Sequence, residues 1–352
     1  GARLLAEGET GAVHPGDPAA AIAIRDASDE LVKPAGSLGA LETVLERWAI
    51  ATGSPPPADP RTAILVFAAD HAVTQHHVSL YPARVSAQVA AAAARHETAI
   101  GVLAEAHHAE LIVVDVGLAG PRIPEVTDRR VANGSADITR GPALTARQLR
   151  SAIESGHALA HELAPRCDLL VLGEIGIGNT TVAAALLAAL TRLPPEAVCG
   201  RGTGLDAQGL ARKRAAVAAA LAANAPEPND PLECLRRVGG LELAALVGAL
   251  LAAASEKRLI ILDGFAVGVA ALTAYRLQPA LRDYLIAGHR SAEPAHHRVL
   301  TELGLEPLLD LRLRLGEASG AALALPLLSL ASKLHHGMRH FDEAGVERVG
   351  PG

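Results

Sequence analysis

The fold of this chain is decided by the stretch Leu169-Leu-Val-Leu-Gly-Glu-Ile-Gly-Ile-Gly-Asn-Thr-Thr181. A short apolar run passes through a glycine-rich turn into an alanine- and leucine-rich segment that starts at Val182, which is typical of a buried strand followed by a helix. Glycines in such a turn let the backbone approach a ligand, and Asn179, Thr180, Thr181 and the free N–H groups of a new helix present donors to an anion. The stretch therefore predicts a phosphate site.

The same stretch does not have the spacing of an NTPase phosphate loop. That loop needs a lysine directly before its hydroxyl residue, whereas this chain has Asn179 before Thr180. We therefore expect a monophosphate rather than ATP, and an ATP-dependent kinase is disfavoured.

Five short apolar runs, this one included, have the character of buried parallel strands, because alanine-rich helical segments separate them. They are residues 63–69, 111–114, 169–172, 259–262 and 284–287. This alternation of strands and helices predicts a doubly wound α/β sheet.

Polar residues suited to chemistry follow each of these runs. They are Asp70-His71, Asp115-Val116-Gly117, Gly173-Glu174, Asp263-Gly264 and Gly288-His289. Ligands of open α/β sheets bind at the carboxyl ends of the strands, so we expect the five endings to converge on one cleft. An ordinary turn or helix cap is the default account of any one ending taken alone.

The helical patterns before Pro55 and after Gly320 lie outside the strand-bearing middle of the chain. We expect the two ends to pack together as a small helical subdomain made of residues 1–55 and 325–352. Residues 56–324 would then form a large α/β substrate-binding domain.

Composition narrows the classes of function. The 352 residues carry a formal charge of -6 and only 2% aromatic residues, which argues against nucleic-acid binding, where basic patches and stacking rings are expected. The longest apolar stretch, residues 238–255, is short for a membrane span and contains Glu242. Residues 1–30 do not resemble a signal peptide, and the three cysteines show no paired metal spacing. We therefore expect a cytoplasmic protein without a membrane or nucleic-acid partner.

A second glycine-rich loop follows at Gly200-Arg-Gly-Thr-Gly-Leu-Asp206, and two cations come shortly after it in Gly209-Leu-Ala-Arg-Lys213. The loop repeats the combination of glycine and hydroxyl residues found at 173–181. A second anion-contacting loop is therefore expected, with Lys213 or Arg201 supplying the charge. Taken alone, the loop is equally compatible with an ordinary glycine turn before a solvated helix.

One carboxylate near the C-terminus stands in a small-residue, apolar setting, namely Glu317 in Leu311-Arg-Leu-Arg-Leu-Gly-Glu-Ala-Ser-Gly320. Such a setting raises the pKa of a carboxyl group toward neutrality, which suits a general base. The segment by itself favours the alternative of a glutamate at a helix N-terminus that interacts with the helix dipole.

Histidines occur in adjacent pairs, which raises the question of a metal. The pairs are His76-His77, His107-His108, His296-His297 and His335-His336. None has the i, i+4 arrangement of a zinc protease with its glutamate, and adjacent histidines on regular elements usually point apart. We therefore expect no metal. The chain also lacks the G-x-S-x-G motif of a hydrolase triad.

Motifs spread in order over nearly the whole chain carry a resemblance to a known family. They are residues 33–42, 67–73, 78–82 with Gln88, 115–118, 173–181, 200–213, 239–242, 262–265, 288–294 and 307–322. In this order they resemble the nicotinate-nucleotide:dimethylbenzimidazole phosphoribosyltransferases, which make the lower-ligand nucleotide of cobalamin. The resemblance implies a Rossmann-like, mainly parallel large domain, a small helical domain from both termini, and a homodimer.

The resemblance also implies a reaction and a set of site residues. Phosphoribose passes from nicotinate mononucleotide to a ring nitrogen of 5,6-dimethylbenzimidazole, giving nicotinate and α-ribazole 5′-phosphate without a metal or redox cofactor. Glu317 would be the catalytic base, and Ser79, Tyr81 and Gln88 would bind the acceptor. The nucleotide site would comprise Glu174, Gly176, Ile177, Gly178, Asn179, Thr180, Arg201, Gly202, Thr203, Gly204, Lys213, Asp263, Gly264 and Ser291.

This chain departs from the family pattern at a few positions. Ala69 and Ala72 stand where glycines are usual, and Ala318-Ser319 replaces a common Gly-Thr after the expected base. Extra methyl groups would narrow or reshape a pocket. Two alternatives therefore stay open: the same reaction with another benzimidazole, a purine or a phenol as acceptor, and a non-catalytic nucleotide-binding homologue.

Overall fold

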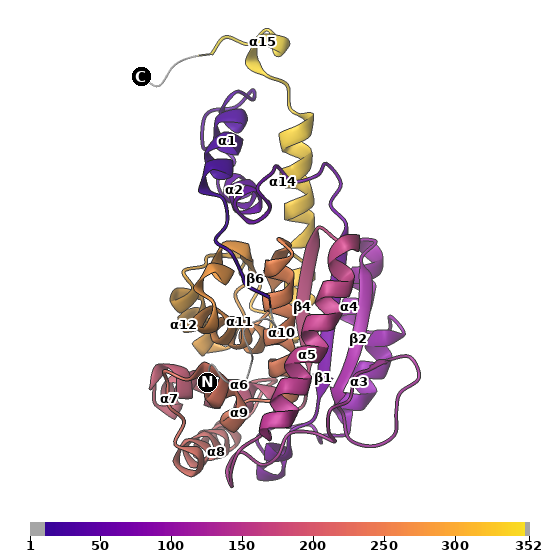
Figure 1. Ribbon diagram of the computed structural model, residues 1–352, viewed down its shortest axis with the longest axis vertical. Helices are drawn as coiled ribbons and strands as arrows, with labels where there is room; N and C mark the ends of the chain where they lie inside the picture. The colour runs from indigo at the N-terminus through magenta and orange to yellow at the C-terminus, as the bar shows by residue number, and fades with distance from the viewer. Residues whose placement is uncertain (1–10, 349–352) are drawn as a thin grey trace.

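The computed structural model describes residues 11–348 of the chain. Its centre is a seven-stranded sheet in which all neighbouring strands are parallel, in the order β3-β2-β1-β4-β5-β6-β7 (Figure 1). The strands are β1 (Thr62–Ala69), β2 (Glu110–Gly117), β3 (Thr127–Asp128), β4 (Leu169–Ile175), β5 (Leu259–Leu262), β6 (Leu285–His289) and β7 (Pro307–Leu309). This sheet confirms the predicted Rossmann-like α/β fold.

All five predicted strands are present, whereas the apolar pattern misses the two edge strands. β3 has two residues and β7 has three, and neither is fully buried. A strand this short at the rim of a sheet needs no continuous apolar run, because only part of it packs against other elements.

Helices cover both faces of the sheet (Figure 1). The α-helices are α1 (Pro18–Asp29), α2 (Ala40–Thr52), α3 (Val85–Ala94), α4 (Ala99–Ala106), α5 (Ala146–Leu163), α6 (Asn179–Thr191), α7 (Pro195–Val198), α8 (Ala207–Asn224), α9 (Pro231–Val238), α10 (Leu241–Ser255), α11 (Phe265–Leu277), α12 (Pro294–Leu303), α13 (Ser319–Ala322), α14 (Leu325–Gly337) and α15 (Phe341–Ala344). Short 3₁₀ segments are η1 (Ala72–His76), η2 (Ala164–Arg166) and η3 (Pro279–Tyr284).

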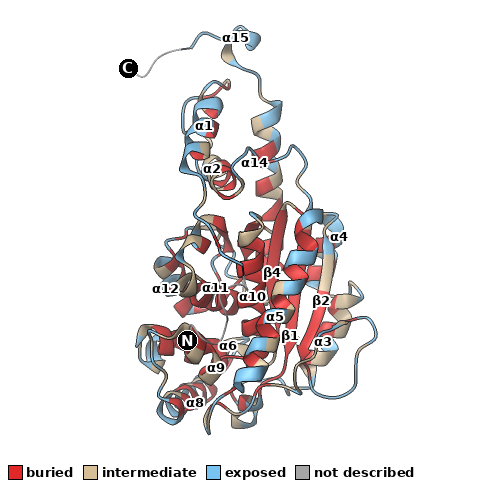
Figure 2. Cartoon of the chain, in the orientation of Figure 1, coloured by how far each residue is buried: buried red, intermediate tan, exposed pale blue. Residues whose placement is uncertain are grey.

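Helix α10 forms the most deeply buried part of the core. Residues 241–254 of this helix are all buried, Glu242 included (Figure 2). Glycines let α10 and α5 pack closely, since a methyl group added at Gly156 would lie 1.8 Å from the carbonyl oxygen of Ala245. Within residues 11–348, no helix is both long and apolar enough to cross a bilayer.

The order of the strands creates a switch point between β1 and β4. From β1 the chain builds outward through β2 and β3, then returns to place β4 against the other side of β1 and continues to β7. Connections leave the carboxyl ends of β1 and β4 in opposite directions, which opens a crevice there.

Segments from both termini lie side by side at one end of the molecule, where α1 and α2 stand beside α14 (Figure 1). Leu31 forms an antiparallel bridge with His340, and the N–H of Val32 donates to the carbonyl oxygen of Arg339 at 3.0 Å. These contacts are those expected of a helical subdomain made of residues 1–55 and 325–352. Residues 1–10 and 349–352 lie outside the described part of the chain. The boundaries of the subdomain stay a prediction.

Candidate active site

Two adjoining cavities lie at the carboxyl ends of β4, β5 and β6. The larger has a volume of about 650 Å³, within the range of small-ligand sites. The smaller has a volume of about 70 Å³. Both are lined by Glu174, Asn179, Thr180, Gly202, Thr203, Arg314 and Leu315. The two cavities therefore share one polar wall.

The five strand endings do not all face these cavities. Glu174 after β4, Gly264 after β5 and His289 on β6 line them. Asp70 instead accepts a hydrogen bond from the N–H of Ala119 at 2.9 Å, and the Asp115 carboxylate pairs with Arg130 at 2.6 Å. The expectation that all five endings meet at one cleft is thus right for three strands; the endings of β1 and β2 hold loops in place.

The predicted phosphate turn presses its backbone against the end of β1. Gly178 has a φ of +94° and stands immediately before the first residue of α6. A methyl group added at Gly176 would lie 2.7 Å from the carbonyl oxygen of Ala69. Glycine is needed at both positions, for a left-handed φ at one and for close approach at the other.

The first N–H groups of α6 are already bonded within the turn. The Asn179 N–H donates to the carbonyl oxygen of Gly176 at 3.2 Å, and the Thr181 N–H donates to that of Gly178 at 2.9 Å. The Thr180 N–H donates to Asn179 Oδ1 at 2.7 Å. The prediction of free N–H donors here is therefore wrong, because the carbonyls of the tight turn and the Asn179 side chain fold back onto them.

Lys213 lies beneath this turn with its side chain fully buried. Its ammonium donates to Thr180 Oγ1 at 2.9 Å and to the carbonyl oxygen of Gly200 at 3.2 Å. Burial lowers the pKa of Lys213, while Glu293 opposes that shift. Because Thr180 accepts a bond from Lys213, the proton of its own hydroxyl is free to point to a ligand.

The second glycine-rich loop is held from the same side by Glu293, a residue that the sequence prediction omits. Glu293 Oε1 accepts a hydrogen bond from the N–H of Gly202 at 2.6 Å. A methyl group added at Gly200 would lie 2.2 Å from Glu293 Oε2. The signal available in the sequence is an acidic residue directly before Pro294 at a helix start.

Two arginines supply positive charge at the cavity wall. Arg201 is the predicted cation of the second loop, and its guanidinium donates to the carbonyl oxygen of Leu205 at 2.8 Å. Arg314 lines both cavities. Only the alternation of leucine and arginine at 311–315 marks Arg314 in the sequence.

Glu174 is the buried carboxyl group shared by the two cavities. Burial raises its pKa to about 8, and the neighbouring carboxylates Glu242 and Asp263 add to the rise. The Asn179 amide donates to Glu174 Oε2 and acts in the opposite direction. Glu174 is therefore mainly protonated at neutral pH.

Glu317 lines the larger cavity and is only 8% exposed. It has a φ of +62° and the following Ala318 has a φ of +68°, so two successive non-glycine residues are left-handed. Burial raises the pKa of Glu317 and Asp263 adds to the rise, while the Thr98 hydroxyl and the Ile100 N–H act against it. The site therefore contains a desolvated carboxylate, as predicted for a base.

Asp263 fixes the segment that follows Glu317. Its Oδ1 accepts hydrogen bonds from the N–H of Gly320 at 2.8 Å and of Ala321 at 3.1 Å. His289 Nε2 lies 3.3 Å from the same oxygen. Asp263 thus caps α13, which leaves the carboxylate of Glu317 free of that task.

The predicted nucleotide residues divide into two groups. The larger cavity is lined by Glu174, Gly176, Ile177, Gly178, Asn179, Thr180, Arg201, Gly202 and Thr203, and the smaller also by Gly264 and Ser291. Gly204, Lys213 and Asp263 line neither cavity. Lys213 and Asp263 instead hold the loops that do.

The predicted acceptor residues are also divided. Ser79 and Tyr81 line the larger cavity, together with an apolar wall that includes Val85 and Val89 of α3. Gln88 lies on the same helix, but its side chain is exposed and lies outside the cavity lining. The acceptor role of these three residues stays a prediction.

The alanines that depart from the family pattern do not face the cavities. Ala69 and Ala318 are completely buried, and Ala72 is exposed on η1. Ser319 turns its hydroxyl to the carbonyl oxygen of Gly316 at 2.7 Å. The expectation that these side chains narrow the pocket is therefore wrong, and they give no direct reason to expect a different acceptor.

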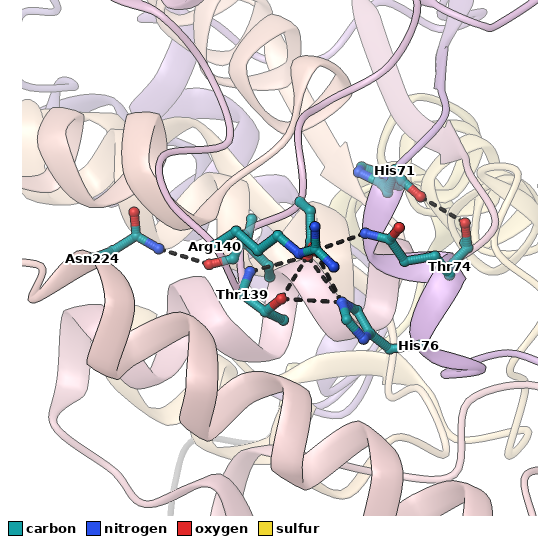
Figure 3. A network of polar contacts seen from close by, with 9 residues as sticks. His71, Thr74, His76, Thr139, Arg140 and Asn224 are labelled. Atoms are coloured by element: carbon teal, nitrogen blue, oxygen red, sulfur yellow. Dashed lines mark hydrogen bonds and ion pairs between the residues drawn. The ribbon is translucent and has the colours of Figure 1, made fainter.

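A polar network anchors the histidine-containing loop after β1 (Figure 3). His76 Nε2 lies 3.0 Å from Asp137 Oδ2 and 3.0 Å from Thr139 Oγ1. Asn224 of α8 donates to the carbonyl oxygen of Ile138 at 2.8 Å. Through residues 11–348, no group of three histidine, cysteine or acidic side chains is arranged to hold a metal ion.

Comparison with known proteins identifies the family of the chain. A family model described as phosphoribosyltransferase matches residues 13–346. The chain belongs to this phosphoribosyltransferase family. The recognition made from the ordered sequence motifs is confirmed.

Relatives across the phosphoribosyltransferase family match almost end to end. A protein of Chloroflexus aurantiacus is 46% identical over 337 residues, covering 95% of this chain and 96% of the relative. One of Chromobacterium violaceum is 48% identical over 335 residues, covering 94% and 97%. Both are named nicotinate-nucleotide--dimethylbenzimidazole phosphoribosyltransferase. The crystal structure of CobT from Thermus thermophilus superposes with a TM-score of 0.89 at 45% identity, covering 94% of this chain and all of that one.

Proposed function

We propose that this phosphoribosyltransferase moves 5-phosphoribose from nicotinate mononucleotide to 5,6-dimethylbenzimidazole. One observation carries the proposal: Glu317, a buried carboxylate with a raised pKa, lines a cavity of about 650 Å³ that adjoins a small polar cavity. This is the arrangement that a single-base glycosyl transfer needs. The names of the relatives support the same reaction.

The chemistry requires little else of the protein. The bond between C1′ of the ribose and the pyridinium nitrogen breaks, and the electron pair leaves with nicotinate, which becomes neutral at that nitrogen. No general acid is needed for this leaving group. A benzimidazole nitrogen forms the new bond to C1′, and the N–H proton on its other nitrogen passes to Glu317. The product is α-ribazole 5′-phosphate, and the desolvated base accounts for about a hundredfold or more of the rate.

The nucleotide is assigned to the polar wall between the cavities. We place its phosphate near Thr180, Gly202 and Ser291, where hydroxyl groups are available and Arg314 is close. The ribose then lies beside Glu174, which is neutral at pH 7 and can donate a hydrogen bond to a sugar oxygen. Lys213 and Asp263 support this site from beneath.

The acceptor ring is assigned to the larger cavity, between the apolar wall and Glu317. Val85, Val89 and Leu313 contribute apolar surface, and Tyr81 provides an aromatic ring at the edge. An apolar bicyclic base with one N–H fits such a wall, because only its N–H needs a polar partner.

We further propose that the protein is a cytoplasmic homodimer. Within each chain, residues 1–55 and 325–352 would form the small helical subdomain and residues 56–324 the large α/β domain. Leu80, Tyr81, Leu311 and Leu315 are all more than half exposed, and they lie beside the larger cavity. A second copy of the chain would cover this apolar rim. Light scattering on the purified protein tests the dimer, and a monomer at micromolar concentration would contradict it.

Nicotinate release from nicotinate mononucleotide, measured with and without dimethylbenzimidazole, tests the reaction. We expect release that depends on the acceptor and a product with the mass of α-ribazole 5′-phosphate. Competition among benzimidazoles, a purine and a phenol then ranks the acceptors. Saturable nucleotide binding without any release in the presence of these acceptors would favour a non-catalytic homologue instead.

Replacing Glu317 with glutamine tests the assigned base. The change keeps the size of the side chain but removes its ability to take a proton, so turnover should fall about a hundredfold or more while nucleotide affinity stays nearly unchanged. Near-normal turnover would refute the role of Glu317 while leaving the reaction itself intact.

A further inference from the structure

The carboxylate of Glu317 reaches the start of a helix distant in sequence. Helix α4 begins after Thr98, whose φ of -108° and ψ of 176° are those of an N-cap residue, yet the Thr98 hydroxyl does not cap its own helix. Thr98 Oγ1 is buried and has no close hydrogen-bond partner among residues 11–348. It is therefore available to turn to a neighbouring acceptor.

The neighbouring acceptor is Glu317. The Thr98 hydroxyl and the Ile100 N–H both lower the pKa of Glu317, which places them beside its carboxylate. Ile100 is the second residue of α4, and its N–H is one that an N-cap side chain normally satisfies. Helix α13, which follows Glu317, packs against α4. Glu317 thus stands where a capping side chain of α4 would stand.

The backbone around Glu317 explains why its carboxylate turns to α4. Its own helix, α13, is capped by Asp263 through the N–H groups of Gly320 and Ala321. The left-handed φ values of Glu317 and Ala318 reverse the chain just before that helix. The N-terminus of α13 therefore does not require the carboxylate of Glu317.

We propose that Thr98, at the N-terminus of α4, is a positioning residue for the base. Its hydroxyl holds one carboxylate oxygen of Glu317 and leaves the other for the acceptor's N–H. This inference rests on the proposed function, in which Glu317 takes that proton. It is consistent with the burial of Thr98 Oγ1 and Glu317 Oε2, since both atoms lack a hydrogen-bond partner within residues 11–348 and a bond between these two groups would satisfy both. The helix dipole of α4 favours the same ionised state.

Other titratable groups around Glu317 act in the opposite sense or are already paired. Asp263 after β5 disfavours a further negative charge, whereas Glu174 on β4 is mainly protonated at neutral pH. His289 on β6 lies beside Gly320 and pairs with Asp263. Near α4, His96 pairs with Glu105 at 3.3 Å. Thr98 and Ile100 are therefore the groups that lower the pKa of Glu317, against burial and Asp263, which raise it.

Replacing Thr98 with valine tests the proposal, because valine keeps the shape and removes the hydroxyl. We expect the acid limb of kcat/KM for the acceptor to move to higher pH, so that activity at pH 6 falls about threefold to tenfold further than activity at pH 8. Nucleotide affinity should stay within about twofold of the parent, because Thr98 lines neither cavity. Thr98→Ser keeps a hydroxyl at this position and should therefore keep the pH profile of the parent.

Thr145 provides a matched control. Its hydroxyl caps α5 by accepting from the N–H of Gln148 at 3.2 Å, and Thr145 lines neither cavity. Thr145→Val should lower thermal stability without moving the pH profile. If Thr98→Val lowers stability and leaves the pH profile unchanged, as Thr145→Val does, Thr98 is only structural and the proposal is overturned.

Two further measurements keep the test independent of folding and of the reaction. In a Glu317→Gln background, Thr98→Val should have no added effect on residual turnover, and an equal loss in both backgrounds would contradict the proposal. Thr98→Ala serves the same purpose if valine prevents folding. Carbon-13 NMR of labelled glutamate, with the Glu317 signal assigned by its loss in E317Q, reports the titration without turnover. An unshifted Glu317 titration in Thr98→Val overturns the inference even if dimethylbenzimidazole proves not to be the acceptor.

Discussion

Replacing Gly320 with alanine should disable the enzyme through one methyl group. The added Cβ would lie 2.0 Å from His289 Cδ2 and 2.2 Å from His289 Nε2. Carbon atoms in contact normally stand about 3.5–4.0 Å apart, so the helix and the ring must separate by roughly 1.5–2 Å. His289 cannot swing aside freely, because its ring is buried and stands 3.3 Å from the Asp263 carboxylate that caps α13. We therefore expect α13 to shift and to carry Glu317 with it.

The expected magnitude follows from this displacement. A shift of about 1 Å in a catalytic group lowers the rate about a hundredfold, which corresponds to about 2.7 kcal/mol in the activation free energy. The free energy of unfolding should fall by about 1–3 kcal/mol, as is usual for an overpacked core. Nucleotide affinity should fall less than turnover, since Gly320 lines neither cavity and only the displaced His289 borders the smaller one.

Nicotinate release, isothermal titration with nicotinate mononucleotide and thermal unfolding measure these three quantities. Gly141→Ala is the matched control, because a methyl group there meets nothing within 4 Å and neither glycine has a left-handed φ. That variant should stay within about 0.5 kcal/mol of the parent stability. If Gly320→Ala retains the parent kcat/KM and stability, the claim that α13 and β6 rigidly position Glu317 is refuted.

Two further predictions concern the buried groups of the polar wall. Lys213→Met leaves Thr180 Oγ1 and the carbonyl of Gly200 without their donor and Glu293 without a nearby cation, so the free energy of unfolding measured in urea should fall by about 3–5 kcal/mol. The control is Lys333→Met at an exposed position, which should change it by less than about 0.5 kcal/mol. Equal effects of the two substitutions would contradict the structural role of Lys213. The folded-state pKa of Glu174 is raised to about 8 from 4.5, so its contribution to stability is present below pH 4.5 and is lost as pH rises toward 8. In thermal melts, Glu174→Gln should therefore gain stability relative to the parent between pH 5 and pH 8. A difference in stability between the two proteins that does not change with pH would refute the raised pKa.

The buried strands could be predicted from the sequence because they are fully covered. Runs such as 169–172 and 259–262 are continuous in apolar residues, and both coincide with observed strands. The edge strand β7 contains a proline and is only half-buried, so the same reasoning misses it. The pattern of apolar residues thus indicates burial, and it fails to predict strands that are only partly buried.

The cavity wall was predictable where glycine and hydroxyl residues follow a strand, as at 176–180. The sequence could not indicate that the first N–H groups of α6 are satisfied within the turn, because for Thr180 that depends on how the Asn179 side chain folds back. Nor could it separate residues that face the ligand from residues that support them. Lys213 and Asp263 have the chemistry of ligand contacts, yet each bonds to protein groups instead.

The choice of Glu317 over Glu174 as the base rests on what each carboxyl group already binds. Four buried acids cluster here, and three have a fixed partner: Glu242 lies 3.1 Å from His71, Asp263 caps α13, and Glu174 accepts from the Asn179 amide. Glu174 also has a pKa of about 8, so at neutral pH it already holds the proton that a base must accept. Glu317 lines the larger cavity and its Oε2 has no hydrogen-bond partner within residues 11–348, while Thr98 and Ile100 lower its pKa. Burial and Asp263 still disfavour that charge, so Glu317 gains a proton readily once an acceptor N–H is beside it. A cluster of like charges thereby supplies one neutral donor and one reactive base in the same cavity.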